Sequence, residues 1–252
     1  APYLHLEYAR PLLEEHQYEE LSAIAARGRS LKTNADFRLY LEKQGLLRKE
    51  VTSALYDGGI RFVDEQLIGP LIRQLEAAGL YEDTIIVVTS DHGEEFGEHR
   101  REGIYGTHGG NLYETLIRVP LIIRAPGEAG AGREIRQQVR SIDIAPTILD
   151  LLGIDVPEEM EGRSLVPLMR GTDTAAPPPA VSEATSQGPE WKSIRDGRYK
   201  LLYVLEGDET SRAGLRGEPI REYLFDITAD PNEQNNIAGK AKDKKHELEG
   251  KL

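Results

Sequence analysis

The stretch Thr84–His99, TIIVVTSDHGEEFGEH, joins an apolar run directly to a cluster of charged side chains. Its first part, Ile85 to Thr89, is β-branched and short, which predicts a strand. A strand that is apolar at every position suits a sheet covered on both faces, as in parallel sheets with helices above and below. Asp91 and His92 follow this strand, so one stretch predicts both a fold class and a site.

Further elements flank this stretch. Apolar residues recur at helical spacing ahead of it, Pro70 is expected to kink or restart that helix, and Gly79 to end it. The apolar positions are Ile60, Val63, Leu67, Leu71 and Leu75. A second strand is predicted at Val119–Ile123, and a helix between Ile142 and Gly153. Alternating helices and strands are typical of an α/β domain.

The segment Thr172–Pro179, with three consecutive prolines, is predicted to be a linker. After it, Asp196-Gly197 separates two strand-like runs, which indicates a hairpin, and REYLFDI is another strand candidate. We therefore expect residues 1–172 to be part of a large α/β domain and residues 180–252 to form a small subdomain. The charged tail from Lys240 is expected to fray.

Composition narrows the classes of partner. The 252 residues carry a formal net charge of -12, which disfavours nucleic acid and anionic membrane surfaces. A small anionic substrate remains compatible, because a bound cation can reverse the field inside a pocket. The chain has no Cys and therefore no disulfide framework. No apolar run approaches the roughly 18 residues of a transmembrane segment. The compartment (periplasmic, secreted or cytoplasmic) stays open.

Asp91 and His92 lie where open α/β sheets bind ligands, just outside the carboxyl end of a strand. A carboxylate beside an imidazole makes a good pair of ligands for a divalent cation. Gly93 is expected to let the backbone turn sharply, so that both side chains reach one point. The alternative is a solvated acidic loop with incidental histidines, since two ligands do not make a site by themselves.

The segments TSDHGEEFGEH and HGGNLYETLIRVPLII resemble the metal-loop signature of the sulfatases, in the alkaline phosphatase superfamily. The segments SIDIAPTILDLLGI, GRSLVPLMRG, WKSIRDGRYKLLY and EYLFDITADPNEQNNIA are similar to later blocks of that family, in the same order. The resemblance implies an alkaline phosphatase-like α/β sandwich with a mixed sheet. It also implies a small C-terminal α+β subdomain with an antiparallel sheet.

The same resemblance implies hydrolysis of sulfate esters by a formylglycine nucleophile and one divalent cation, most often Ca2+. Asp91 and His92 match two of the metal ligands. Many members have Asn in place of His92, and the softer imidazole can shift the preference toward Mn2+ or Zn2+. His108 stands where many sulfatases place a Lys that contacts the sulfate and assists the leaving group. His99 is the second candidate for that contact; the alternative is a surface His that bonds its own loop.

Other parts of the family's site have no counterpart in these residues. The sequence has no Cys, no Ser-x-Pro-Ser-Arg motif and no Asp-Asp pair after an N-terminal strand. The family's His-x-Pro-Tyr motif is matched only by Ala1-Pro2-Tyr3. We therefore expect the C-terminal part of a longer sulfatase, whose partners are the missing N-terminal half and a small anionic sulfate ester. Residues 1–252 alone are expected to bind metal weakly and to turn over nothing.

Two other functions fit the same residues. Phosphate and phosphonate ester hydrolases of the superfamily share the Asp-His-Gly-Glu loop, and this region does not separate sulfur from phosphorus esters. A non-catalytic sulfatase-like module that keeps the fold is the other reading. For the side chains of the predicted hairpin, substrate contact and ordinary sheet packing both stay open. These side chains are Trp191, Arg195, Tyr199 and Lys200.

Overall fold

The computed structural model of the protein describes residues 5–27, 41–43, 45, 48–99, 108–128, 131–185, 189–205 and 219–252. The chain forms two compact units: Ala1–Tyr81 with Glu94–Thr107, and Glu82–Gly93 with His108–Leu252. The segment Ala1-Pro2-Tyr3 lies outside the described residues. The division into residues 1–172 and 180–252 stays a prediction.

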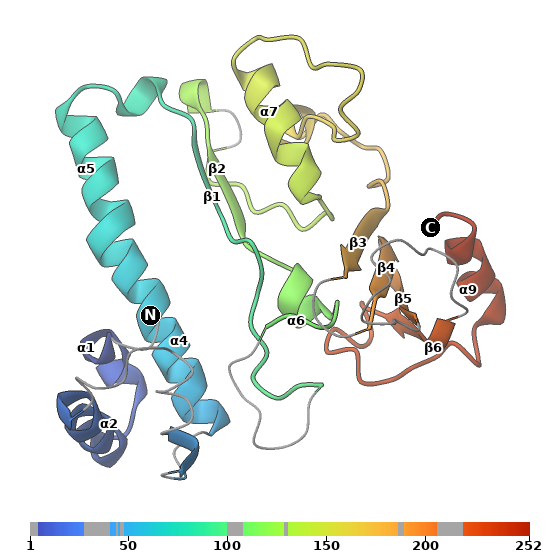
Figure 1. The fold of residues 1–252 in the computed structure, drawn as a ribbon. Helices are drawn as coiled ribbons and strands as arrows, with labels where there is room; N and C mark the ends of the chain where they lie inside the picture. Colours follow the sequence, from blue (N-terminus) through green and yellow to red (C-terminus); the bar gives the residue numbers. More distant parts are fainter. Residues whose placement is uncertain are drawn as a thin grey trace. The chain divides into compact units, whose positions relative to one another are not determined.

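The first unit is helical. Its described residues include the helices α1 (Leu6–Ala9), α2 (Glu15–Arg27), α4 (Lys49–Val63) and α5 (Gly69–Ala77). Figure 1 shows α1 and α2 beside α4, and buried apolar side chains of all three helices form one core. Helix α1 lies so close to α4 that a Cβ on Gly58 would be 2.8 Å from the Cβ of Ala9. No helix in the described residues is long and apolar enough to cross a bilayer.

A π-helical turn, Asp64–Ile68, joins α4 and α5 into one continuous helix that begins at Lys49. Pro70 has no N–H to donate, and the wider turn ahead of it accommodates this loss. The α-helical hydrogen bonding is interrupted by this turn and restarts at Gly69 with Pro70 in the first turn, so the predicted restart at Pro70 is confirmed. The predicted helix end at Gly79 is also confirmed, since its φ is +67°.

The apolar stripe of this helix does not face the core of its unit. Ile60, Val63, Leu67 and Leu71 are exposed, whereas the buried positions of α4 lie nearer its start, where α1 packs. The spacing identified the helix correctly. It could not tell which side α1 and α2 would cover.

The second unit contains a two-stranded sheet of β1 (Ile86–Thr89) and β2 (Leu121–Arg124). Both predicted strands are present, but they pair antiparallel, with Thr89 opposite Leu121. They are also less buried than predicted, since Ile122 is 62% exposed. An apolar β-branched run favours a strand but does not encode the direction of its neighbour.

A four-stranded antiparallel sheet follows the linker. Its strands pair in chain order: β3 (Ala180–Ala184), β4 (Trp191–Asp196), β5 (Tyr199–Leu205) and β6 (Pro219–Asp226). Gly197, at a φ of +58°, makes the predicted hairpin turn between β4 and β5. The predicted helix between Ile142 and Gly153 is α7 (Ile144–Leu151), and α8 (Val166–Met169) precedes the linker. Residues 172–179 contain neither helix nor strand, as predicted.

Two separate layers cover the faces of this sheet. Because side chains alternate along a strand, Leu201 and Leu202 of β5 point to opposite faces. Leu201 packs with Leu248 of α9 (Lys242–Glu249), and Figure 1 shows α9 beside the sheet. Leu202 packs with Leu112, just ahead of α6 (Glu114–Ile117). The prediction of a frayed tail is therefore wrong, since one apolar side chain anchors an otherwise charged helix.

Leu248→Ala should lower the free energy of unfolding of the second unit by about 2–5 kcal/mol, because Leu248 is fully buried in the sheet's core. Leu252→Ala is the matched control, since Leu252 is 42% exposed and should change stability by less than about 0.5 kcal/mol. Chemical denaturation of both variants measures the difference. Equal stabilities would show that α9 is not packed on the sheet.

Candidate active site

The residues that follow β1 form a tight local turn. The hydroxyl of Ser90 donates to the carbonyl oxygen of His92 at 2.7 Å, and the His92 N–H donates to Asp91 Oδ1 at 3.0 Å. These bonds hold the backbone while the Asp91 side chain stays 87% exposed. The structure thus places a solvent-facing carboxylate directly beside an imidazole, as the sequence predicts.

The His92 ring is held in one orientation. Its Nδ1 lies 2.7 Å from the carbonyl oxygen of Gly93, and because a carbonyl only accepts, Nδ1 carries the proton. Nε2 is then the lone-pair atom, and it lies 3.8 Å from Asp91 Oδ2. Metal-binding histidines typically donate their other ring N–H to a backbone carbonyl in this way.

Two acceptor atoms that face each other at this distance suit a cation. Ligand atoms about 2.1 Å from one ion can lie at most about 4.2 Å apart, and Asp91 Oδ2 and His92 Nε2 fall inside that limit. The donor set therefore fits a divalent metal. Within the described parts of the chain, no group of three or more His, Asp or Glu residues could hold a metal ion. Asp91 and His92 can thus supply only part of a coordination sphere.

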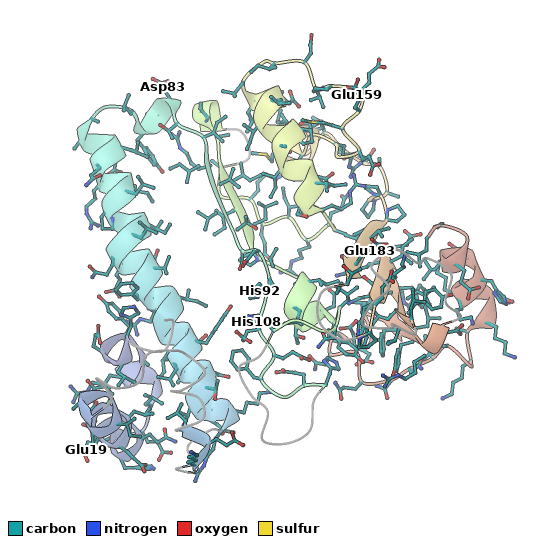
Figure 2. The ribbon with its side chains drawn as sticks, in the orientation of Figure 1. Glu19, Asp83, His92, His108, Glu159 and Glu183 are labelled. Atoms are coloured by element: carbon teal, nitrogen blue, oxygen red, sulfur yellow. The ribbon has the colours of Figure 1, made fainter. Side chains whose placement is uncertain are left out.

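His108 lies against His92. Their rings stack with centroids 4.3 Å apart and planes 28° apart, and Figure 2 shows the two side chains together near α6. Gly109 and Gly110, which follow His108, both have positive φ, of +84° and +76°. The structure thus brings three predicted residues together: Asp91, His92 and His108. An imidazole beside the two acceptors can donate a hydrogen bond or a proton to an anion there.

Gly93 is required by a close backbone contact, and not by the sharp turn that the sequence predicts. Its φ is not positive; instead a Cβ would lie 2.0 Å from the carbonyl oxygen of Thr115 in α6. The Gly93 N–H donates to the carbonyl oxygen of Leu116 at 2.7 Å. The loop that carries His92 is therefore pressed against the backbone of α6.

His99 lies in the first unit, where its Nδ1 is 3.2 Å from Glu95 Oε1. Its side chain is only 7% exposed and that of Glu95 is fully buried. The alternative prediction for His99 is a surface histidine that bonds its own loop. The bond to Glu95 agrees with that prediction, but the side chain is not at the surface. A substrate contact by His99 stays a prediction.

The hairpin side chains take part in packing. Trp191 is buried in the apolar core, and Lys200 is fully buried beside Glu114 and Glu233. Sequence reasoning missed this group of charges. Its members lie far apart in the chain, and no local pattern pairs them.

Gly93→Ala should destabilise the contact between this loop and α6, because the new methyl group would overlap the Thr115 carbonyl oxygen. We expect a loss of about 1–3 kcal/mol in the free energy of unfolding, as for other overpacked sites. Gly239→Ala is the control, since a Cβ there meets nothing within 4 Å. If thermal melting shows the two variants to be equally stable, the close approach of Gly93 to α6 is wrong.

Comparison with known families gives two matches that together span most of the chain. Residues 17–154 match the sulfatase family, and residues 105–252 match the N-sulphoglucosamine sulphohydrolase C-terminal family. Human arylsulfatase K is 32% identical over 197 residues, which cover 75% of this chain and 34% of that protein. N-acetylglucosamine-6-O-sulfatase of Bacteroides thetaiotaomicron is 33% identical over 187 residues, covering 74% and 32%.

Solved structures agree with these matches. A protein in complex with its substrate, D-glucosamine-2-N,6-O-disulfate, is 30% identical with a TM-score of 0.65, covering 84% of this chain and 43% of its own. The phosphonate monoester hydrolase of Agrobacterium radiobacter is 29% identical with a TM-score of 0.62, covering 79% and 40%. The predicted α/β fold class is thereby confirmed. The chain spans about a third of the length of the curated relatives it matches. Sulfatases are hydrolases that use a metal ion and a formylglycine, and this chain belongs to the sulfatase family.

Proposed function

We propose that the protein to which these residues belong hydrolyses sulfate esters, with Asp91 and His92 as two of its metal ligands. The observation that carries the proposal is the pair of acceptors, Asp91 Oδ2 and His92 Nε2, facing each other at 3.8 Å. The sulfatase family match over residues 17–154, which contains this pair, supports the same reading. The small anionic ester would enter beside Asp91 and His92, here named the doublet. The other metal ligands would come from protein outside these residues.

Each residue has a distinct part in this proposal. A bound divalent cation, with Ca2+ the first choice and Mn2+ or Zn2+ the alternatives, would supply Lewis acidity, and a formylglycine the nucleophile. Asp91 contributes negative charge at the ion. His92 contributes a lone pair whose direction is fixed by the bond from Nδ1 to the Gly93 carbonyl oxygen.

His108 would contact the sulfate and give a proton to the departing alcohol oxygen. Its support is the stacking on His92, which keeps an ionisable ring beside the proposed metal. A general acid must reach the leaving oxygen directly or through one water. His99 is the second candidate for this role, but its buried bond to Glu95 ties the ring to its own loop.

Asp91→Asn and His92→Ala should lower the affinity of the full-length protein for its metal by more than the 10- to 100-fold that outer-shell partners typically cost. Arylsulfatase activity should fall with metal content, measured by elemental analysis after dialysis. Asp155→Asn is the control, because Asp155 is an exposed carboxylate that follows α7. His108→Asn should keep the metal and lose kcat.

Metal content that survives in both ligand variants would remove Asp91 and His92 from the coordination sphere. Loss of metal in the Asp155→Asn variant as well would mean that net surface charge, not ligation, governs binding. In either case the doublet would no longer identify the site.

A second candidate function is hydrolysis of phosphonate or phosphate monoesters, favoured by the likeness to the phosphonate monoester hydrolase. Sulfate and phosphate esters differ mainly in charge, so matched aryl esters separate the two readings. We expect kcat/KM for the aryl sulfate to exceed that for the aryl phosphonate by at least about tenfold, a difference of about 1.4 kcal/mol in transition-state binding. The reverse order would assign the phosphonate activity. A full-length protein inactive on both would favour a non-catalytic module.

A further inference from the structure

Four charged side chains meet between the sheet and α6, and are here named the charge cluster: Arg195 of β4, Lys200 of β5, Glu114 of α6 and Glu233 of the loop after β6. The Lys200 Nζ atom is fully buried, 3.2 Å from Glu114 Oε1 and 2.8 Å from Glu233 Oε1. The Arg195 guanidinium bonds the other oxygen of Glu114. Arg195 and Lys200 are paired residues on adjacent strands, so their charges reach the same side of the sheet.

Stability alone is a weak reason for such a cluster. The attraction between buried charges offsets little of the free energy that they lose on leaving water. Apolar side chains of similar volume often stabilise a fold equally well. Glu233 adds a second cost, since its backbone φ is +54°, a region that disfavours residues with side chains. Burial raises the pKa of Glu233, and the neighbouring positive charge of Lys200 acts against that rise. We therefore expect these residues to have a role other than stability.

The cluster fixes the first residue of α6 in two ways. Glu233 Oε2 accepts the backbone N–H of Glu114 at 2.6 Å, and Lys200 and Arg195 hold the Glu114 carboxylate. Both the backbone and the side chain of Glu114 are thus attached to the C-terminal sheet. Because α6 has only four residues, its position follows that of Glu114.

Helix α6 is in turn joined to the segments that carry both histidines, to one by a hydrogen bond and to the other by the chain itself. Its Leu116 carbonyl oxygen accepts the N–H of Gly93, the residue after His92. In sequence, Leu112 lies between His108 and α6. Its side chain is buried with Trp191 and Phe225. The stacking of His108 on His92 therefore depends on where the sheet holds α6.

We propose that the charge cluster sets the position of His108 against His92, with Lys200 and Glu233 as positioning residues that act through α6. This inference rests on the proposed function in one respect: the histidine pair it positions is the proposed metal and substrate site. The positioning itself involves neither metal nor substrate, so it can be tested without them.

The test uses the full-length protein with 13Cε1-labelled histidine. The nuclear Overhauser effect between the His92 and His108 ring protons reports their stacking without metal or substrate. In Lys200→Met two buried carboxylates lose their shared cation, so we expect this cross-peak to disappear and kcat/KM to fall about 10- to 100-fold, as for small misplacements of a site. Lys192→Met is the matched control: Lys192 lies on neighbouring β4 but pairs with Glu183. Its cross-peak and kcat/KM should stay as in the wild type.

A conservative second change separates positioning from folding. Glu233→Gln keeps an acceptor for the Glu114 N–H and removes one negative charge, so the double variant Lys200→Met/Glu233→Gln should recover part of the cross-peak. If Lys200→Met does not fold, the double variant decides by the same readouts. A folded Lys200→Met variant, or a folded double variant, whose cross-peak equals that of the wild type would overturn the inference.

The two proposals fail in different ways. A cross-peak that depends on Lys200 in a protein without sulfatase activity supports the positioning and rejects the proposed function. If the protein is an active sulfatase and substitution of Lys200 leaves the cross-peak unchanged, only the positioning is rejected.

Discussion

The hydrogen bond from the Gly93 N–H to the Leu116 carbonyl oxygen is the contact on which the site depends. It connects the loop after β1 to a short helix that is itself attached to a different sheet. Only a residue without a Cβ allows the two backbones to come this close. The geometry of Asp91 and His92 is therefore a property of the whole second unit, and not of the loop that carries them.

The elements that depend on neighbouring residues were predictable from the sequence. The interruption at Pro70 and the hairpin at Gly197 follow from backbone chemistry that acts over a few residues. Features set by distant partners were not predictable. The antiparallel pairing of β1, the exposed side of α4 and the ordered α9 are all decided by what packs against each element.

The candidate site divides in the same way. Asp91 and His92 are adjacent in sequence, so their proximity could be inferred directly, and the family resemblance pointed to His108. The sequence offered no signal that Lys200 would be buried between Glu114 and Glu233. A lysine in an otherwise apolar strand reads locally as a solvated residue, because only the folded chain brings two carboxylates to it.

Helix α9 closes one face of the sheet, and it is synthesised after all four strands that it covers. During translation the strands can pair before Leu248 exists, which leaves Ile194, Leu201 and Leu224 open to water or to other chains. Such transient apolar surface is the kind that chaperones bind and that aggregates grow from. The delay between synthesis of the strands and synthesis of α9 therefore bears directly on how much of this protein reaches its native state.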